Sequence, residues 1–335
     1  MLKMTPQGTV RLMIVGCGGI SHMHINNLVR LSNAEIVGLC DVNPENIKIL
    51  KENFPVLKGV EEFNDYRKMY ESTEADAVLI LTPHTLHFNQ AIDALNKRMH
   101  VLVEKPLTTK VEHARILVEK ASEKNMVLMV SYQRHYEAPF RFIKASIESG
   151  EIGEIQFVSS LLTQEWMRLT KGTWRQDPEL SGGGELMDSG SHIVDFILWS
   201  TGLKPSEVFA KVDYRGCRVD INSSLTVKFS NGALASISIV GNAPRFEEYH
   251  AIYGTQGAIF YCNGKVSILD GEGAFSKTPL KIPFKPNNPD RNFVMSILGL
   301  EKPESPGECG LRVIELTEAA MESARRGEKI SLGNN

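Results

Sequence analysis

The strongest constraint on the fold is a regular alternation of apolar runs and helical patterns over the first 131 residues. Apolar segments with the character of buried strands lie at residues 10–15, 36–40, 77–81, 100–103 and 127–131. Helical patterns fill the intervals at residues 20–31, 44–53, 84–98 and 109–124. Continuous apolar strands separated by helices are typical of a parallel sheet that is covered on both faces. The sequence therefore predicts a doubly wound α/β domain over residues 1–132.

After Tyr132 the pattern changes to strands joined by tight turns. Strands are expected at residues 154–164, 208–214, 224–229, 233–240, 249–253 and 258–261, and helices at 137–148, 185–201, 289–299 and 308–326. The pairs Asn231-Gly232 and Asn263-Gly264 favour β-hairpins, and hairpins build antiparallel sheets. Residues 133–335 are therefore predicted to form a second, α+β domain.

Composition and charge exclude several classes of protein. The chain has 335 residues, 42% hydrophobic and 23% charged, which is enough for two cores. A net charge of −3 without a run of Lys and Arg argues against a nucleic-acid or anionic-membrane partner. No apolar stretch has the length of a transmembrane helix, and residues 1–9 lack a signal-peptide core. Five widely spaced cysteines predict reduced thiols and a cytoplasmic protein.

A glycine-rich turn, Gly16-Cys17-Gly18-Gly19-Ile20-Ser21, follows the first predicted strand and opens the first predicted helix. This is the G-x-G-x-x-G pattern of dinucleotide sites with Ser21 at the third position, and its glycines let the backbone approach a pyrophosphate. Asp41 follows 20 residues later, where its carboxylate can accept hydrogen bonds from ribose hydroxyls. It would repel a 2′-phosphate, and no arginine lies in residues 42–48 to neutralise one. The pattern predicts NAD in preference to NADP; a glycine turn without a nucleotide is the alternative.

A second glycine-rich stretch, Gly182-Gly183-Gly184, precedes a possible acid–base pair. In a helix over 185–201, Asp188 and His192 would share one face at i, i+4 spacing, with Asp195 joining them. A carboxylate beside an imidazole fixes its tautomer and raises its basicity, which suits proton abstraction. The alternative is a solvated helix face. A metal site at Asp188 and His192 has no support from another cluster at ligand spacing, so no metal is expected.

A lysine follows the fourth predicted strand in Glu104-Lys105-Pro106. Ligands of open parallel sheets bind outside the carboxyl ends of the strands, and Pro106 restricts Lys105 to extended conformations. Lys105 is therefore a candidate for contact with a bound ligand, although a surface lysine would fit the same pattern.

Together, in their order, these motifs resemble the glucose–fructose oxidoreductase, inositol dehydrogenase and rhizopine-catabolism (Gfo/Idh/MocA) family. The landmarks are Gly16–Ile20 with His24, Thr82-Pro83 with His87, Glu104–Pro106, Trp174-Arg175, Gly182–Gly184, Asp188–His192 with Asp195, and Gly310–Val313 with Ser323 and Gly327. The resemblance covers essentially the whole chain. It implies an N-terminal Rossmann domain and a C-terminal domain on an open, mostly antiparallel sheet. Family members are often dimers or tetramers through that sheet, so a homodimer or homotetramer is expected.

The resemblance also implies an activity, namely NAD(P)-dependent oxidation or reduction of a secondary alcohol or ketone on a sugar, cyclitol or related polyol. It carries catalytic roles onto Lys105, Asp188 and His192. The expected cofactor contacts are Gly16, Gly18, Gly19, Ile20, Asp41, Thr82, Pro83, His84, His87, Glu104, Lys105 and Gln133. The expected substrate contacts are Lys105, Arg134, Trp174, Asp188 and His192.

The sequence departs from the family pattern at two places, and two alternative functions are compatible with the same motifs. His84 stands where the family commonly has Asn, and Gln133-Arg134 replaces a pair of adjacent arginines. An NAD-dependent glycosidase would use the same residues in a transient oxidation. A non-catalytic protein that binds NAD and a sugar would have no need of Lys105, Asp188 and His192 together.

Overall fold

The computed structural model describes residues 8–273, 275–277, 284 and 287–333. The chain divides into two compact units, neither of which is one continuous segment. The first comprises residues 1–108, 112–133 and 287–311, and the second comprises 109–111, 134–286 and 312–335. The expected domain boundary between residues 132 and 133 stays a prediction. The structure adds that the late segment 287–311 clusters with the first unit.

The first unit contains a six-stranded, wholly parallel sheet in the order β3-β2-β1-β4-β5-β6. Its strands are β1 (Val10–Val15), β2 (Ala34–Cys40), β3 (Glu61–Phe63), β4 (Ala77–Ile80), β5 (His100–Val103) and β6 (Leu128–Val130). Every residue of β4 and β6 is buried, as expected for strands covered on both faces. The predicted doubly wound sheet is confirmed.

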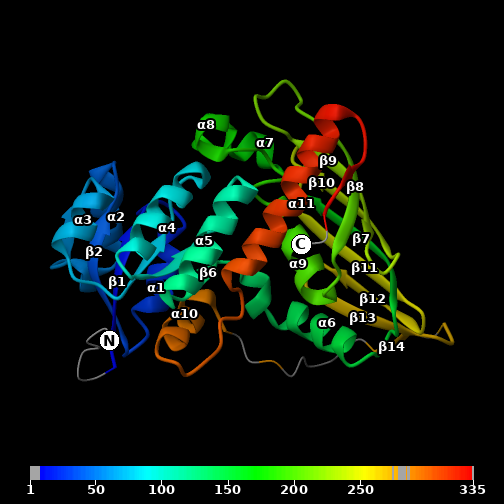
Figure 1. The fold of residues 1–335 in the computed structure, drawn as a ribbon, viewed down its shortest axis with the longest axis horizontal. Coiled ribbons are helices and arrows are strands. Elements are labelled where there is room, and N and C mark those ends of the chain that lie inside the picture. Colours follow the sequence, from blue (N-terminus) through cyan, green and yellow to red (C-terminus); the bar gives the residue numbers. More distant parts are fainter. Residues whose placement is uncertain (1–7, 274, 278–283, 285–286, 334–335) are drawn as a thin grey trace. The chain divides into compact units, whose positions relative to one another are not determined.

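Helices accompany this sheet (Figure 1). They are α1 (Ser21–Leu28), α2 (Pro44–Asn53), α3 (Tyr66–Ser72), α4 (His87–Asn96), α5 (Val111–Lys124) and α10 (Pro289–Ile297), with 3-10 turns η1 (Pro55–Leu57) and η2 (His84–Leu86). A further 3-10 turn, η3 (Gln133–Tyr136), belongs mostly to the second unit. Side-chain caps mark the starts of α2 and α3. The side chain of Asn43 accepts the N–H of Glu45 at the start of α2, and Asp65 accepts the N–H of Arg67 at the start of α3.

The second unit is built on a nine-stranded sheet in the order β14-β13-β12-β11-β7-β10-β9-β8-β15. Its strands are β7 (Ile155–Thr163), β8 (Pro205–Asp213), β9 (Asn222–Phe229), β10 (Leu234–Val240), β11 (Glu247–Gly254), β12 (Gly257–Cys262), β13 (Lys265–Asp270), β14 (Phe275–Lys277) and β15 (Ile330–Ser331). Only the β7–β10 pair is parallel among these neighbours. The predicted mostly antiparallel sheet is confirmed, as are both predicted hairpins. Gly232 and Gly264 occupy their turns with φ of 91° and 89°.

Helices pack on one face of this second sheet. They include α6 (Ala138–Glu148) and α9 (Gly190–Thr201), which pack against each other, with α9 also on β7 and α6 on β13 (Figure 1). Phe140 of α6 lies 5.0 Å from the ring of Phe196 on α9 and 4.7 Å from the ring of Tyr261 on β12. The remaining helical elements are α7 (Trp166–Leu169), η4 (Trp174–Gln176), α8 (Pro178–Ser181) and α11 (Gly307–Arg326).

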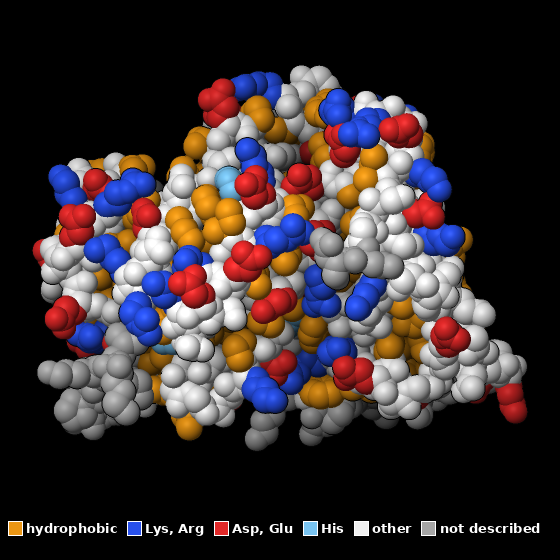
Figure 2. All heavy atoms as spheres, viewed as in Figure 1, with side chains coloured by type: hydrophobic (Ala, Val, Ile, Leu, Met, Phe, Trp, Pro, Cys, Tyr) orange, Lys and Arg blue, Asp and Glu red, His pale blue; other side chains and the backbone are white. Residues whose placement is uncertain are grey.

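Helix composition and the distribution of surface charge both bear on function. No helix among the described residues combines the length and apolar character needed to cross a bilayer. On the face shown in Figure 2, Lys and Arg side chains are interspersed with Asp and Glu, without a large field of one sign.

Candidate active site

The glycine turn of the first unit has the geometry that a pyrophosphate site needs. Gly16 has φ of 94°, and a Cβ there would lie 2.7 Å from the carbonyl carbon of Leu81, so only glycine fits. At Gly18 and Gly19 a Cβ would meet no atom within 4 Å, which leaves open space beside the backbone. The hydroxyl of buried Ser21 donates to the carbonyl of Gly18 at 2.6 Å. The serine at the third position of the pattern, Ser21, therefore stabilises the turn through a hydrogen bond to its backbone.

The carboxylate of Asp41, at the end of β2, is fixed in direct contact with this turn. It accepts the backbone N–H groups of Cys17 and Asn43, both at 2.8 Å, and the side-chain amide of Asn46 at 3.1 Å. A carboxylate offers about four acceptor positions, so capacity remains for a ribose hydroxyl. Ile20, in the same turn, is 38% exposed and available for contact with a ligand. These residues fit a dinucleotide.

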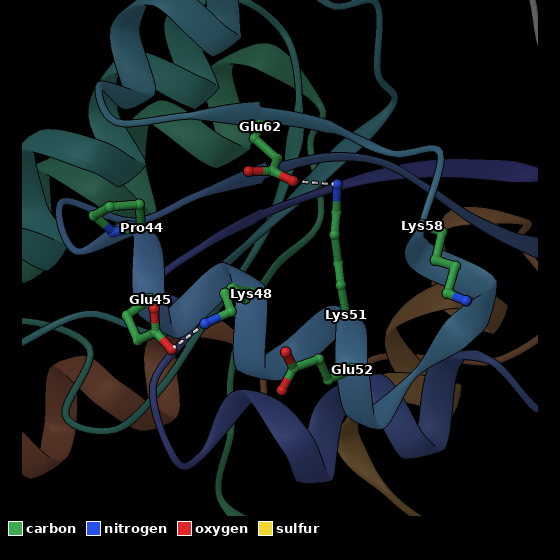
Figure 3. Close-up of a pocket in the computed structure, with 7 residues that line it drawn as sticks. All are labelled: Pro44, Glu45, Lys48, Lys51, Glu52, Lys58 and Glu62. Atoms are coloured by element: carbon green, nitrogen blue, oxygen red, sulfur yellow. Dashed lines mark hydrogen bonds and ion pairs between the residues drawn. The ribbon is translucent and has the colours of Figure 1, made fainter.

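A surface pocket lies nearby on α2, lined by Pro44, Glu45, Lys48, Lys51, Glu52, Lys58 and Glu62 (Figure 3). Within it, Lys48 pairs with Glu45 at 2.9 Å and Lys51 pairs with Glu62 at 2.5 Å. Because Lys48 and Lys51 are paired with glutamates of the same pocket, they do not form an anion-binding site, and we assign the pocket no role.

The turns after β4 and β5 are joined by a buried histidine. His87 places Nε2 2.8 Å from the carbonyl oxygen of Thr82 and Nδ1 2.8 Å from that of Pro106. Burial lowers the pKa of His87, although both carbonyls act in the opposite direction. His84 is also buried, and the Thr82 hydroxyl donates to Gln90 at 2.6 Å. The cofactor contacts expected of Thr82, Pro83, His84 and His87 stay predictions.

Glu104 and Lys105 lie at the carboxyl end of β5, joined to Pro106 by a cis peptide bond. One carboxylate oxygen of Glu104 lies 3.1 Å from Nε2 of His24 and accepts the side-chain amide of Gln133 at 3.3 Å. The other accepts the backbone N–H of Lys105 at 3.2 Å. Burial would raise the pKa of Glu104, but His24 and Lys105 lower it below its ordinary value. Glu104 is thus hydrogen-bonded to two other predicted cofactor residues, Lys105 and Gln133.

In the second unit, the last of the three glycines, Gly184, is explained by Asp220, a residue that the sequence motifs do not mark. A Cβ at Gly184 would lie 1.9 Å from the carbonyl oxygen of Asp220. The Asp220 carboxylate accepts the backbone N–H groups of Gly184 at 2.8 Å and Leu186 at 2.9 Å. Burial raises the pKa of Asp220, while these N–H groups partly counter it. No motif marks Asp220 in the sequence, because its role depends on a contact between distant segments.

The predicted helix over 185–201 is wrong at its start, since α9 begins at Gly190 and Asp188 lies in the preceding turn. The N–H of Asp188 donates to Gly184, but the N–H of Gly190 donates to Glu185, five residues earlier. Asp188 and His192 are therefore not on one face of a continuous helix. A physical reason is that Gly190, where α9 begins, would lie inside the predicted helix, and glycine is a poor residue for a helix interior.

Asp195 also differs from expectation. It is expected from the sequence to join Asp188 and His192 on one helix face, but it is buried and its carboxylate contacts Nε2 of buried His135 at 2.8 Å. The rest of α9 is apolar on most sides, so its polar Asp195 is accommodated by a partner within the same unit.

Asp188 is held by two residues of the segment that precedes the glycines. Its Oδ2 accepts the indole N–H of Trp166 at 2.8 Å and Nε of Arg175 at 3.0 Å, and its side chain is 4% exposed. The Arg175 guanidinium lies 4.5 Å from the ring centre of Trp174. His192, partly exposed, follows in the first turn of α9. The structure thus fixes one carboxylate beside the start of a helix that carries a histidine.

Arg134 is anchored inside the second unit. Its Nε donates to Glu248 on β11 at 2.8 Å, and its guanidinium lies 5.4 Å from the ring centre of Phe140. Glu248 also contacts Nε2 of buried His250 at 2.9 Å. Burial would raise the pKa of Glu248, but His250 and Arg134 lower it to about 2. The substrate contact expected of Arg134 stays a prediction.

Comparisons with known proteins cover both units. Residues 10–132 match a family described as an oxidoreductase family with an NAD-binding Rossmann fold. Residues 140–260 match the GFO/IDH/MocA C-terminal domain. The two matches follow one another in the order that the resemblance of the sequence motifs implied.

Several characterised relatives match along nearly the whole chain. The myo-inositol 2-dehydrogenase of Thermotoga maritima is 24% identical over 96% of this chain and 98% of its own. The WlbA dehydrogenase of Chromobacterium violaceum, solved with NADH and UDP-GlcNAcA, is 26% identical with a TM-score of 0.88, over 100% of this chain and 99% of its own. The Bordetella pertussis WlbA dehydrogenase, with the same ligands, is 26% identical with a TM-score of 0.86, over 99% and 100%. With both domain models matched in order, the chain belongs to the GFO/IDH/MocA family of oxidoreductases, with an NAD-binding Rossmann fold.

Proposed function

We propose that this protein is an NAD-dependent dehydrogenase or reductase that acts on a secondary alcohol or ketone of a sugar, cyclitol or related polyol. The observation that carries the proposal is the glycine turn, open at Gly18 and Gly19, with Asp41 hydrogen-bonded to its Cys17 N–H. This arrangement supplies backbone donors for a pyrophosphate and a fixed carboxylate for a ribose. Asp41 favours NAD because it would repel the 2′-phosphate of NADP.

When bound, NAD supplies the acceptor for the hydride that leaves the carbinol carbon of the substrate. Gly16, Gly18 and Gly19 would hold its pyrophosphate at the start of α1, and Asp41 its ribose. Thr82, Pro83, Glu104 and Gln133 would complete the cofactor site from the carboxyl ends of the neighbouring strands, with Ile20, His84 and His87.

The chain's own side chains would handle the substrate proton and charge. His192 would take the proton of the substrate hydroxyl as general base. The Asp188 carboxylate, fixed by Trp166 and Arg175, would orient the imidazole and stabilise its charged form. Lys105 would stabilise the negative charge that develops on the substrate oxygen. Trp174 and Arg134 would contact the remainder of the substrate.

The substrate class draws support from the relatives. One curated relative is a myo-inositol 2-dehydrogenase, and the two WlbA dehydrogenases were solved with a nucleotide-linked sugar acid. myo-Inositol and the sugar of UDP-GlcNAcA both carry secondary hydroxyl groups on a six-membered ring. A cyclic polyol is therefore the substrate class that we propose.

The open face of the second sheet supports a homodimer or homotetramer. Phe157, Leu234 and Tyr253 lie in register on three neighbouring strands and are 37%, 41% and 40% exposed. Adjacent exposed apolar side chains on a sheet are typical of an interface between protein chains. A cytoplasmic location, where the five free cysteines would stay reduced, is also part of the proposal.

The direct test is to mix the purified protein with NAD, and separately with NADP, across a panel of cyclitols, aldoses, anhydrosugars and nucleotide-linked sugars. Formation of reduced nicotinamide is followed by absorbance. NAD-dependent signal with one class of cyclic polyol is the expected result. Release of a free sugar from a glycoside without net NADH would overturn the proposal in favour of an NAD-dependent glycosidase. Binding of NAD without turnover in either direction would indicate a non-catalytic binder.

A further inference from the structure

His24 on α1 is wholly buried between two carboxylates of the first unit. Its Nδ1 lies 2.5 Å from Oδ1 of Asp290, and its Nε2 lies 3.1 Å from Oε1 of Glu104. Ionised carboxylates only accept hydrogen bonds, and only an imidazolium donates from both ring nitrogens. The geometry therefore calls for a positively charged His24 with a negative charge on either side.

The Asp290 end of this arrangement is buried and hydrogen-bonded on both carboxylate oxygens. Asp290 is completely buried in the first turn of α10, and its second carboxylate oxygen accepts the side-chain amide of Asn27 at 2.7 Å. A helix N-terminus favours a negative side chain in its first turn. With His24 and Asn27 as partners, the Asp290 carboxylate is held in one orientation against α1.

At the other end, Glu104 contacts Lys105, the residue proposed to act on the substrate. Glu104 is hydrogen-bonded to the backbone N–H of Lys105, the next residue, at 3.2 Å. Through His24 it is also tied to α1, the helix that the glycine turn opens. The charged or titratable groups that face Glu104 are His24 from α1, Lys105 from its own turn and His87 from α4, with Asp290 beyond His24.

We propose that His24, clamped by Asp290, is a positioning residue that keeps Glu104 ionised and fixes the Glu104–Lys105 turn relative to the cofactor-binding helix. His24 touches neither cofactor nor substrate, since its side chain is completely buried. Its effect on catalysis passes through Glu104 to the placement of Lys105. The inference rests on the proposed function in giving Lys105 a role toward the substrate.

The electrostatics of the site agree with this role. Burial would lower the pKa of His24, but Asp290 and Glu104 raise it to about 10, so the imidazolium persists through neutral pH. Burial would raise the pKa of Glu104, and His24 is the foremost influence that lowers it. Without His24, burial would dominate and Glu104 would take up a proton at a higher pH than it does now.

The test variant is His24→Gln, which has no positive charge. Its matched control is His22→Gln, two residues earlier on the same helix, where the histidine is partly exposed and its Nε2 lies within hydrogen-bond distance of the Asn53 side chain. The first readout is the ¹³C resonance of the Glu104 carboxyl group in protein labelled at glutamate, identified by its loss in Glu104→Gln. We expect it to titrate at least about one pH unit higher in His24→Gln than in the wild type or in His22→Gln.

The second readout is the pH dependence of kcat with the polyol found in the substrate panel. In His24→Gln, kcat at neutral pH should fall about tenfold or more, and the acid limb of its profile should move to higher pH, as the Glu104 resonance does. A fall in kcat that is equal at every pH, with an unmoved Glu104 resonance, would show a merely structural role and overturn the inference.

A second variant and a readout that does not depend on turnover keep the test decisive. If His24→Gln does not fold, Asp290→Asn replaces it, and we expect the same direction of shift with a smaller size, because the imidazolium loses one of its two carboxylates. An unmoved Glu104 titration in Asp290→Asn would then count against the clamp. If no polyol is turned over, the proposed function fails, whereas the resonance measurement still decides whether His24 holds Glu104 ionised.

Discussion

The carboxylate of Asp41 accepts a hydrogen bond of 2.8 Å from the backbone N–H of Cys17, inside the glycine turn. This contact joins the residue proposed to choose between NAD and NADP to the residues proposed to hold the pyrophosphate. A change at Asp41 should therefore affect both the affinity for NAD and the discrimination against NADP.

We expect Asp41→Ala to raise the KM for NAD about ten- to a hundredfold, the cost of losing a charge-assisted hydrogen bond. The ratio of kcat/KM values for NAD and NADP should fall, because the repulsion of a 2′-phosphate is removed. Steady-state kinetics with both cofactors measures this ratio. Glu45→Ala is the control, since Glu45 is an exposed acid on α2 that pairs with Lys48 on the same helix. An unchanged ratio in Asp41→Ala would contradict the assignment.

Close packing at Gly184 gives a prediction for the second unit. Gly184→Ala would place a Cβ 1.9 Å from the backbone oxygen of Asp220, so one of the two segments must move. We expect a loss of about 1–3 kcal/mol in the free energy of unfolding, as for other overpacked sites. Denaturant unfolding followed by circular dichroism measures it. Gly59→Ala should leave stability nearly unchanged, because a Cβ at Gly59 meets no atom within 4 Å. Equal stability of the two variants would contradict the packing argument.

The fold could be predicted from the sequence wherever a strand is a continuous apolar run. The central strands β1, β4 and β5 lie within one residue of their predicted bounds, because both faces of a parallel sheet demand apolar residues. Strand β3, Glu61–Phe63, was missed because it is three residues long and two of them are acidic. Such an edge strand is defined by its pairing with β2 and not by its own pattern.

The candidate site could be predicted where its residues are close in sequence. The glycine turn and Asp41 follow a local pattern, and the structure brings them together. By contrast, the partners that fix the predicted residues come from distant segments. His24 and Asp290 are 266 positions apart, and Gly184 and Asp220 are 36 apart. Periodicity carries no information on such contacts.

The role of His192 can be tested by its removal. His192→Ala should lower kcat by about a hundred- to ten-thousandfold, the usual contribution of a general base. The dissociation constant for NAD should stay unchanged, because the residues proposed to bind NAD lie in the first unit. Stopped-flow turnover and calorimetric NAD titration measure the two quantities. His22→Ala is the control histidine. Wild-type turnover in His192→Ala would rule out the assignment.

Stability at acid pH should report on the Arg134–Glu248 pair. The pKa of folded Glu248 is about 2, below its ordinary value of 4.5. Between these two values the unfolded chain binds a proton that the folded chain does not, so stability falls as pH falls. The contribution of Glu248 should therefore be complete above about pH 5 and be lost toward pH 2, and it is on the order of 3 kcal/mol.

The matching experiment compares urea unfolding of the wild type, Glu248→Gln and Glu247→Gln between pH 3 and pH 7. The difference between the wild type and Glu248→Gln should narrow as pH falls. Glu247, one residue earlier and paired with Arg245, has a side chain that is 38% exposed, and its loss should change little at any pH. A wild-type advantage over Glu248→Gln that did not depend on pH would contradict the lowered pKa.

The open face of the second sheet gives a prediction about assembly. Tyr253 lies between Phe157 and Ala258 in register, at the centre of a row of neighbouring strands. Tyr253→Glu would place a charge inside an apolar contact between two copies of the chain, where an unpaired charge is strongly unfavourable. Light scattering after size-exclusion chromatography should show a dimer or tetramer for the wild type and the monomer mass for Tyr253→Glu. Arg30→Glu, an exposed substitution in the first unit, should leave the mass unchanged. A monomeric wild type, or an unchanged mass in Tyr253→Glu, would exclude this face as the interface.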